Sequence, residues 1–332
     1  MLRQLLVLAS CSLLPLASAF LGGASAAPPL AALGARRAAM NRPSGVVSLR
    51  AAGSDCATTV VGGGRIGLTL QQFGKDAGFD DTLVKRGEKV PSDGSGPIYV
   101  CTRNDALKGV IAECPPERRE DLVFYGQNGF IEDFLRAEGV FDSSTKVLVY
   151  MAVAKLGEKP TDGITSVNPE GLTAATGKGG PMGGAAREGH AIGGHARGLT
   201  RFGVEDATFQ ASMYEKLMWI TSFMLLGVHH GGITVGEVEE KHRDDLAKMV
   251  IEMAACVTEE KGVAFKAGMA ERLCAYAKTV GHFPTALKEF EWRNQYWLDT
   301  TRAREAAGKQ DLTPFHTELL LKARDNAHVS FP

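Results

Sequence analysis

A glycine-rich segment behind a β-branched run is the strongest constraint on how this chain folds. Residues 57–61 read ATTVV, residues 62–67 read GGGRIG, and residues 66–78 have the composition of a helix. A dinucleotide pyrophosphate site needs a strand, a turn that only glycine makes, backbone free of side chains, and a helix N-terminus facing the anion. All four occur in order, so the segment predicts a dinucleotide site and not only a tight surface turn. The glycines with G-x-G-x-x-G spacing are Gly62, Gly64 and Gly67.

Short apolar runs continue this pattern to about residue 160. They alternate with polar stretches that are compatible with helices, and unbroken apolar strands of this kind suit a parallel sheet covered on both faces. The fold class expected is α/β, with an N-terminal Rossmann domain over residues 54–205. The further runs are DTLVKR (81–86), PIYVCT (97–102), DLVFYG (121–126) and KVLVYMAVA (146–154).

The end of this domain is rich in glycine. Residues 177–198 contain nine glycines in 22 residues and follow no strand, so we interpret them as a linker or surface insertion and not as a phosphate loop. His190 and His195 lie in this segment, and histidines on such backbone are usually solvated. We therefore predict no metal site here.

The pattern changes to helix after Phe209. Three stretches carry apolar residues at spacings of three and four, with glycine at their ends: residues 211–228, 236–262 and 265–280. The sequence predicts an all-helical C-terminal domain over residues 206–332, for substrate binding and dimerisation.

The first 53 residues differ from the rest of the chain. They contain five arginines and no acidic residue, and they begin with an apolar stretch that ends at the small residues Ala17-Ser18-Ala19. That stretch is shorter than the roughly 20 residues of a membrane helix. We interpret residues 1–53 as a disordered bipartite leader, a signal peptide followed by a transit peptide to the plastid stroma; a plain secretory signal is the alternative.

Charge and cysteine content limit the partners. The formal charge of −1 becomes about −6 without the leader arginines, and no basic run remains, so we expect no nucleic-acid partner. No membrane contact of the mature form is expected either. The cysteines show no paired spacing, which is typical of buried thiols in a reducing compartment.

The second predicted strand ends in two cations that bear on the cofactor. Where an NAD-preferring protein usually carries Asp or Glu, this chain has Lys85 and Arg86, which would pair with a 2′-phosphate. NADPH or NADP is therefore the expected cofactor, with Arg65 as a further candidate for the phosphate. Solvated charges at a strand end are the alternative. Ile66 and Thr102 complete the predicted cofactor-binding set.

Three later motifs resemble the ketopantoate reductase family, within the 6-phosphogluconate-dehydrogenase-like group. They are GPIYVCTRNDAL, DLVFYGQNG and YEKLMW, and the resemblance covers most of residues 57–300. The motifs TRND, NPEGLTAA and HFPTALKEFEWRN are most similar to a plastid branch found in plants and algae. The resemblance implies a Rossmann domain joined to a helical domain, with substrate between them.

The resemblance also implies catalytic residues. The family lysine, glutamate and asparagine match Lys216, Glu289 and Asn128. Hydride reduction of a ketone creates an alkoxide, so an ammonium such as Lys216 can supply the proton, while Asn128 orients the carbonyl or nicotinamide. Glu289 would bind a substrate hydroxyl or hold the lysine. The alternatives are a surface lysine, a solvated carboxylate and an ordinary Asn-Gly turn.

Two further residues are expected at the substrate. Arg103 follows a strand at the edge where such sheets bind ligands, so it could anchor a carboxylate; an ion pair with Asp105 or Asp121 is the alternative. Asn294 lies in the aromatic stretch after Glu289. The family's second substrate-binding asparagine, four residues after the lysine, is replaced by Ile220, which predicts either a different substrate or a decayed site.

Together these features predict an NADPH-dependent reductase of a small 2-oxo acid, similar to 2-dehydropantoate 2-reductase. The alternatives are a non-catalytic NADP-binding sensor or assembly protein of the plastid, and a β-hydroxyacid or opine-type dehydrogenase. His229 and His230 are adjacent, so on regular structure they cannot both ligate one metal, and we expect loop and cap roles for them.

Overall fold

The computed structural model describes residues 58–76, 78–94, 96–125, 128–169, 171–177 and 202–325. The predicted leader, residues 178–198 of the glycine-rich segment, and His190 and His195 lie outside the described residues.

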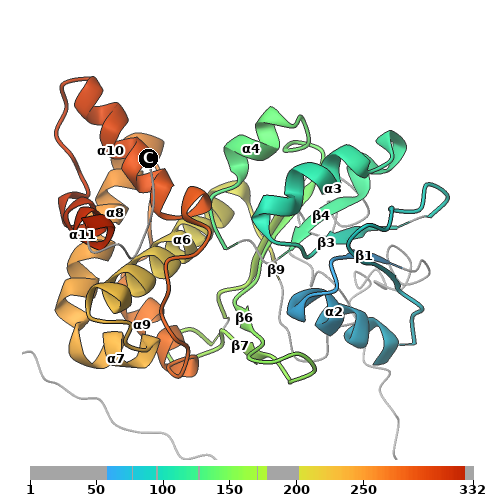
Figure 1. Ribbon diagram of the computed structural model, residues 1–332, viewed down its shortest axis with the longest axis horizontal. Helices are drawn as coiled ribbons and strands as arrows, with labels where there is room; N and C mark the ends of the chain where they lie inside the picture. Colours follow the sequence, from blue (N-terminus) through green and yellow to red (C-terminus); the bar gives the residue numbers. More distant parts are fainter. Residues whose placement is uncertain are drawn as a thin grey trace, which may run out of the picture. The chain divides into compact units, whose positions relative to one another are not determined.

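A seven-stranded sheet forms the first half of the described chain (Figure 1). Its order is β2-β1-β3-β4-β5-β8-β9; β1 to β5 are parallel, and β8 runs antiparallel to β5. The strand order reverses direction between β1 and β3, which is where open α/β sheets bind ligands beyond the carboxyl ends of their strands. The strands are β1 Thr59–Val61, β2 Thr82–Val84, β3 Ile98–Val100, β4 Leu122–Tyr125, β5 Thr145–Leu148, β8 Ala174–Gly177 and β9 Phe202–Gly203.

Both faces of this sheet are buried. Side chains alternate along each strand, so Val60 and Tyr99 pack on one face with Leu70, while Val61 and Ile98 pack on the other face. The first face is covered by α2 and the second by α3 and α4. This two-sided burial explains why the strands appear in the sequence as unbroken apolar runs. The covering elements are α2 Arg65–Asp76, η1 Asn104–Ala106, α3 Leu107–Glu113, η2 Pro116–Asp121 and α4 Glu132–Ala137.

The second half is helical and is built around α6, Asp206–His229. Every residue from 213 to 227 is buried, as expected of a helix that is apolar on all sides. Helices α7 to α9 and α11 pack against α6, and the helices gather around it in Figure 1. The remaining elements are α7 Val235–Lys241, α8 Arg243–Lys261, α9 Met269–Thr279, η3 Phe290–Trp292, α10 Asn294–Ala306 and α11 Pro314–Asp325. The predicted fold class, a Rossmann domain followed by an all-helical domain, is confirmed.

Two predicted elements are divided in the structure. The run 146–154 forms β5 and then a separate strand β6, Met151–Ala152, which pairs with β7, Thr161–Asp162, outside the main sheet. The stretch 236–262 forms α7 and α8, because His242 leaves helical geometry with φ −130° and ψ 31°. Periodicity alone detects neither break, since both sides of each break keep their apolar pattern.

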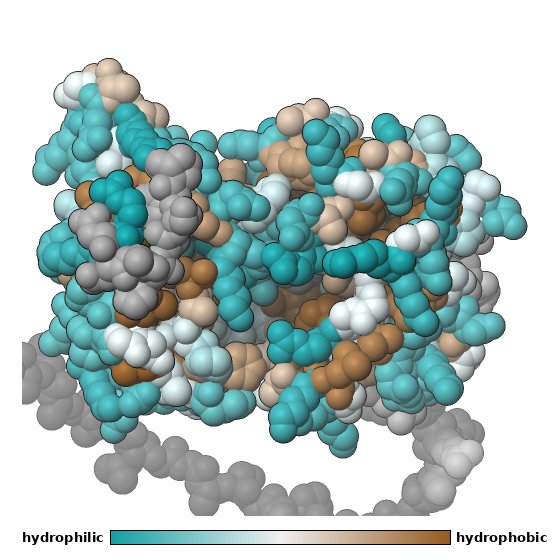
Figure 2. Space-filling view, in the orientation of Figure 1, coloured by the Kyte–Doolittle hydropathy of each residue, from teal (hydrophilic) through white to brown (hydrophobic). Residues whose placement is uncertain are grey.

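The surface is mostly polar, as expected when the apolar side chains are buried in the interior. Hydrophilic side chains cover most of the face in Figure 2, and hydrophobic ones lie there in small groups. Within the described part of the chain, no helix combines the length and the apolar character needed to cross a membrane.

Close packing of two glycines joins β1 to α2. A Cβ built on Gly67 would lie 1.9 Å from the carbonyl oxygen of Gly62 and 3.3 Å from Cγ1 of Val60. The obstructing atom belongs to the backbone, so it cannot rotate aside. Only glycine at residue 67 lets the helix pack this closely on the strand.

Gly67→Ala is therefore expected to destabilise the protein by about 2 kcal/mol, the usual cost of forcing extra atoms into a packed site. The matched control is Gly64→Ala, because a Cβ at Gly64 meets nothing within 4 Å. Thermal unfolding followed by circular dichroism should show a lower Tm for the first variant and little change for the second. Equal shifts for both variants would contradict the packing role.

Candidate active site

The glycine loop forms a cradle of exposed backbone at the start of α2. Gly62 has φ +109°, a conformation that glycine adopts readily, and its N–H donates to the carbonyl of Val84 at 2.9 Å. Gly64 is exposed and open on its Cβ side, and the first turn of α2 carries no acidic residue. Backbone amides and the positive end of the helix therefore face solvent without competition from a carboxylate, which suits a pyrophosphate.

Lys85 and Arg86 lie next to this cradle. Both side chains are exposed just after β2, and a Cβ on Gly63 would be 3.8 Å from Cγ of Lys85. The geometry is compatible with the predicted pairing to a phosphate, since two cations occur where β2 and the glycine loop meet.

Arg65 has a structural contact that the sequence did not indicate. Its Nη1 donates to the carbonyl oxygens of Val153 and Ala154, at 2.8 and 3.0 Å. These two hydrogen bonds hold the segment after β6 against the glycine loop. Ile66 packs against the apolar cluster beneath α2.

Two polar side chains after β3 are buried without partners. Thr102 Oγ1 and Asn104 Nδ2 are both inaccessible, and neither has a hydrogen-bond partner among the described residues. A buried polar group without a partner costs roughly 1–3 kcal/mol, so such groups commonly face a ligand or ordered water. Thr102 also borders the glycine loop, because its Cγ2 lies 3.1 Å from a Cβ placed on Gly62.

Lys216 is the most perturbed cation in this region. It belongs to the buried stretch of α6, is 6% exposed, and its Nζ donates to the carbonyl of Val149 at 2.7 Å. Burial, with the positive charge of Arg293 as a second cause, lowers the pKa of Lys216 to about 7. A lysine that titrates near neutral pH can exchange a proton with a reacting group.

Arg293 connects the two halves of the site. Its Nε donates to the carbonyl of Asn128 at 2.6 Å, and its Nη2 pairs with Glu289. Glu289 in turn accepts a hydrogen bond from the backbone N–H of Asn104 at 3.4 Å. The segment before α10 is thus joined to the loops that follow β3 and β4.

Glu289 has a strained backbone. Its φ of 49° makes it the one non-glycine residue with positive φ in the described ranges. Such a conformation costs about 1–3 kcal/mol, and it persists where the surroundings hold it, often at functional sites. Here the ion pair with Arg293 holds the side chain in place.

Three predicted residues have other surroundings. Asn294, predicted at the substrate, is 1% exposed, and its Oδ1 lies 3.1 Å from Nε2 of His316, so it packs α10 against α11. Arg103 forms the alternative ion pair with Asp105, at 3.1 Å, with both side chains largely exposed. Ile220 lies in the helical core.

Arg293, a residue that sequence reasoning did not assign to the site, therefore contacts Glu289 and the backbone of Asn128, and its charge is one cause of the lowered pKa of Lys216. Its only signal was its position in the aromatic stretch EWRN. Asn104 was not assigned to the site either, although it lies in the TRND motif. The connecting role of Arg293 depends on contacts with residues 165 positions away in the chain.

Fold and site together define a protein with an N-terminal Rossmann-type sheet and a C-terminal helical domain that contributes a buried lysine. This chain aligns with nearly the whole length of three solved structures that have this architecture. A ketopantoate reductase of the PanE/ApbA family from Ralstonia eutropha JMP134 has 17% identity and a TM-score of 0.57, with 82% of this chain and 100% of that chain covered. A 2-dehydropantoate 2-reductase from Methylococcus capsulatus has 14% identity and a TM-score of 0.53, with 83% and 98% covered.

D-mandelate dehydrogenase, solved with NADH, is the third. It has 14% identity and a TM-score of 0.56, with 82% of this chain and 100% of that chain covered. No protein-family model matches the sequence, and no curated protein does. At these identities the likeness establishes the fold, which the chain shares with ketopantoate reductases.

The lowered pKa of Lys216 predicts a pH-dependent effect on stability. In the unfolded chain this lysine has its ordinary pKa of 10.5, whereas in the folded protein it titrates at about 7. Protonation therefore favours unfolding; the penalty is complete below pH 7 and disappears as the pH rises toward 10.5. Lys216→Met removes that penalty.

We expect Lys216→Met to raise the Tm at pH 6 by more than at pH 9.5. The control is Lys108→Met, which removes an exposed lysine of α3 and should give the same small change at both values. Thermal unfolding at the two pH values measures the difference. A Lys216→Met effect that does not change with pH would contradict a buried ammonium.

Proposed function

We propose that this protein is an NADPH-dependent reductase of a small 2-oxo acid, related in its scheme to 2-dehydropantoate 2-reductase. The observation that carries the proposal is the buried Lys216, whose pKa is lowered to about 7, beside the pair formed by Arg293 and Glu289. A proton donor with this pKa and a nearby guanidinium match what reduction of an ionised oxo acid requires.

The charge of the site supports an anionic substrate. Burial and then the charge of Arg293 lower the pKa of Lys216, and burial together with the charge of Arg103 lowers the pKa of Arg293. Three cations therefore lie near one another, with Glu289 as the partner of Arg293 and Asp105 as the partner of Arg103. A substrate carboxylate would offset the excess positive charge, and a guanidinium can bind it through two parallel hydrogen bonds.

The residues of the dinucleotide cradle fit a nicotinamide cofactor. Gly64 leaves room for phosphate oxygens, and the unpartnered Thr102 Oγ1 offers a hydrogen bond beside the loop. Lys85 and Arg86 support NADPH over NADH, because a 2′-phosphate would pair with them. When bound, the cofactor would supply a hydride to the carbonyl carbon of the substrate.

In the proposed reaction, Lys216 supplies the proton. The ammonium, held by the carbonyl of Val149, donates one proton to the carbonyl oxygen of the substrate as that oxygen gains negative charge. The product is the 2-hydroxy acid, and the lysine is left as a neutral amine that takes its next proton from water. Arg293 holds the substrate carboxylate while Glu289 positions Arg293.

Ile220 supports a substrate other than ketopantoate. Its side chain is apolar and belongs to the helical core, so it offers no hydrogen bond at the position of the family's second asparagine. We propose that the oxo acid carries an apolar group at this side.

We also propose a location and an assembly for the protein. The basic, acid-free residues 1–53 support import into the plastid stroma, and the helical domain supports a homodimer. The similarity of the motifs TRND, NPEGLTAA and HFPTALKEFEWRN to a plastid branch of plants and algae supports the same location.

The cofactor preference can be tested with Lys85→Ala and Arg86→Ala. Each lost charge-assisted contact is worth about 1.5–3 kcal/mol, so the Kd for NADPH should rise about tenfold or more per variant while the Kd for NADH stays nearly constant. Nucleotide binding followed by protein fluorescence gives both constants. If the two cofactors lose affinity equally, the cations do not read the 2′-phosphate.

The reaction can be tested with a panel of 2-oxo acids and Lys216→Met. Loss of a general acid commonly lowers kcat by about 10² to 10⁴, so NADPH oxidation should fall by this range while NADPH binding is retained. Because the ammonium is the active form, kcat/KM of the unaltered protein should decline above about pH 7. Lys108→Met serves as the control.

Other outcomes identify the alternatives. NADPH binding without oxidation by any 2-oxo acid would favour a non-catalytic sensor. Turnover with β-hydroxy acids or with an amine and an oxo acid would favour the related dehydrogenases.

A further inference from the structure

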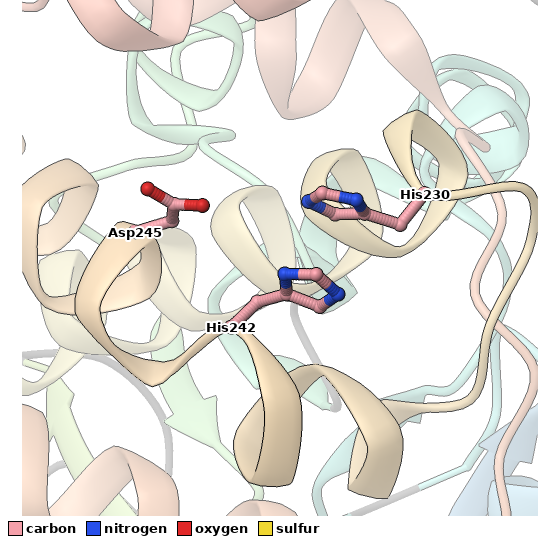
Figure 3. A group of neighbouring side chains, drawn as sticks. All are labelled: His230, His242 and Asp245. Atoms are coloured by element: carbon pink, nitrogen blue, oxygen red, sulfur yellow. The ribbon is translucent and has the colours of Figure 1, made fainter.

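A second group of polar side chains lies at the far end of α6, separate from the candidate active site. His230 follows the last residue of α6, His242 separates α7 from α8, and Asp245 lies in the first turn of α8. One ligand atom from each residue lies within 4.8 Å of the others. Figure 3 shows ring nitrogens of the two histidines and the carboxylate of Asp245 around a common space.

The local sequence explains why the three residues meet. Gly231 and Gly232 both have positive φ, 88° and 82°, so the chain reverses immediately after His230. Thr234 and Glu237 then form a capping box that begins α7. The seven-residue α7 ends at His242 and returns the chain to the end of α6.

In this group, the hydrogen-bonding capacity of His230 is not satisfied. His230 Nε2 is buried and has no hydrogen-bond partner within the described ranges, although the residue as a whole is half-buried. The rings of His230 and His242 stack at 3.5 Å between centroids with 14° between planes.

We propose that His230, His242 and Asp245 form a binding site for a divalent transition-metal ion of the Zn²⁺ class. Two imidazole nitrogens and one carboxylate oxygen are a donor set that Zn²⁺ accepts, with water completing a tetrahedral shell. The orphaned Nε2 of His230 gains a partner in this arrangement. The nearly parallel rings tilt on binding, because the in-plane lone pairs of stacked imidazoles do not converge on one point.

The proposed ion would connect three segments of the helical domain. A metal ion here ties the end of α6 to the junction of α7 and α8, and α6 is the helix that carries Lys216 about four turns away. The three ligands come from segments on both sides of one chain reversal, so an ion would join the end of α6 to the junction of α7 and α8. This inference does not depend on the proposed reductase function.

The test is titration of the full chain with Zn²⁺ against a chromogenic chelator. The unaltered protein should bind Zn²⁺ with micromolar affinity or better, and both His242→Ala and Asp245→Asn should weaken binding at least tenfold. Asp245→Asn keeps the shape of the side chain, and its Tm without metal confirms that it folds. His229→Ala is the matched control, because His229 is adjacent but exposed and outside the group.

Two further measurements complete the test. Zn²⁺ should raise the Tm of the unaltered protein but not that of Asp245→Asn, and Co²⁺ should give the visible absorption of a tetrahedral site only where the three ligands are intact. A double variant, His190→Ala with His195→Ala, should retain the site. The proposal is overturned if the unaltered protein does not bind Zn²⁺ with micromolar affinity, or if His242→Ala binds Zn²⁺ as tightly as the unaltered protein does.

Discussion

The hydrogen bond from Lys216 Nζ to the carbonyl of Val149 joins the central helix of the second domain to the chain just beyond β5. An ammonium placed among apolar side chains is stable only if something accepts its protons, and here one backbone carbonyl does so. The same burial that makes this contact necessary lowers the pKa of the lysine into the range useful for proton transfer. The contact between the two domains and the proposed proton transfer thus both depend on the buried ammonium of Lys216.

The surrounding charges extend this constraint. Arg293 disfavours the protonated form of Lys216, and Glu289 holds Arg293 while accepting from the backbone after β3. The strained φ of Glu289 is maintained by this ion pair. Cations near one another form a site that an anion would complete, which supports the proposed substrate with an ionised carboxyl group.

Much of the first domain was predictable because its strands are buried on both faces and the close packing of β1 on α2 needs glycine. The runs around β1 to β4 predicted strands within a residue or two of their observed bounds, and Gly67 has the packing role that the spacing suggests. The division of residues 146–154 into β5 and β6 was not predictable, since pairing of β6 with β7 depends on a partner ten residues away. The break between α7 and α8 at His242 was not predictable either, because the apolar periodicity continues on both sides of it.

The candidate site was predictable in part. Lys216, Glu289 and Asn128 were predicted from short motifs, whereas the contacts of Arg293 with Glu289 and Asn128 and the contact of Asn294 with His316 were not predictable. The sequence by itself determined the element types and the glycine loop, because these follow from local propensity, from side-chain spacing and from the backbone freedom of glycine. Only the tertiary structure decided which polar groups meet, because burial, pKa and the approach of His230 to His242 arise from packing between segments that local sequence does not relate.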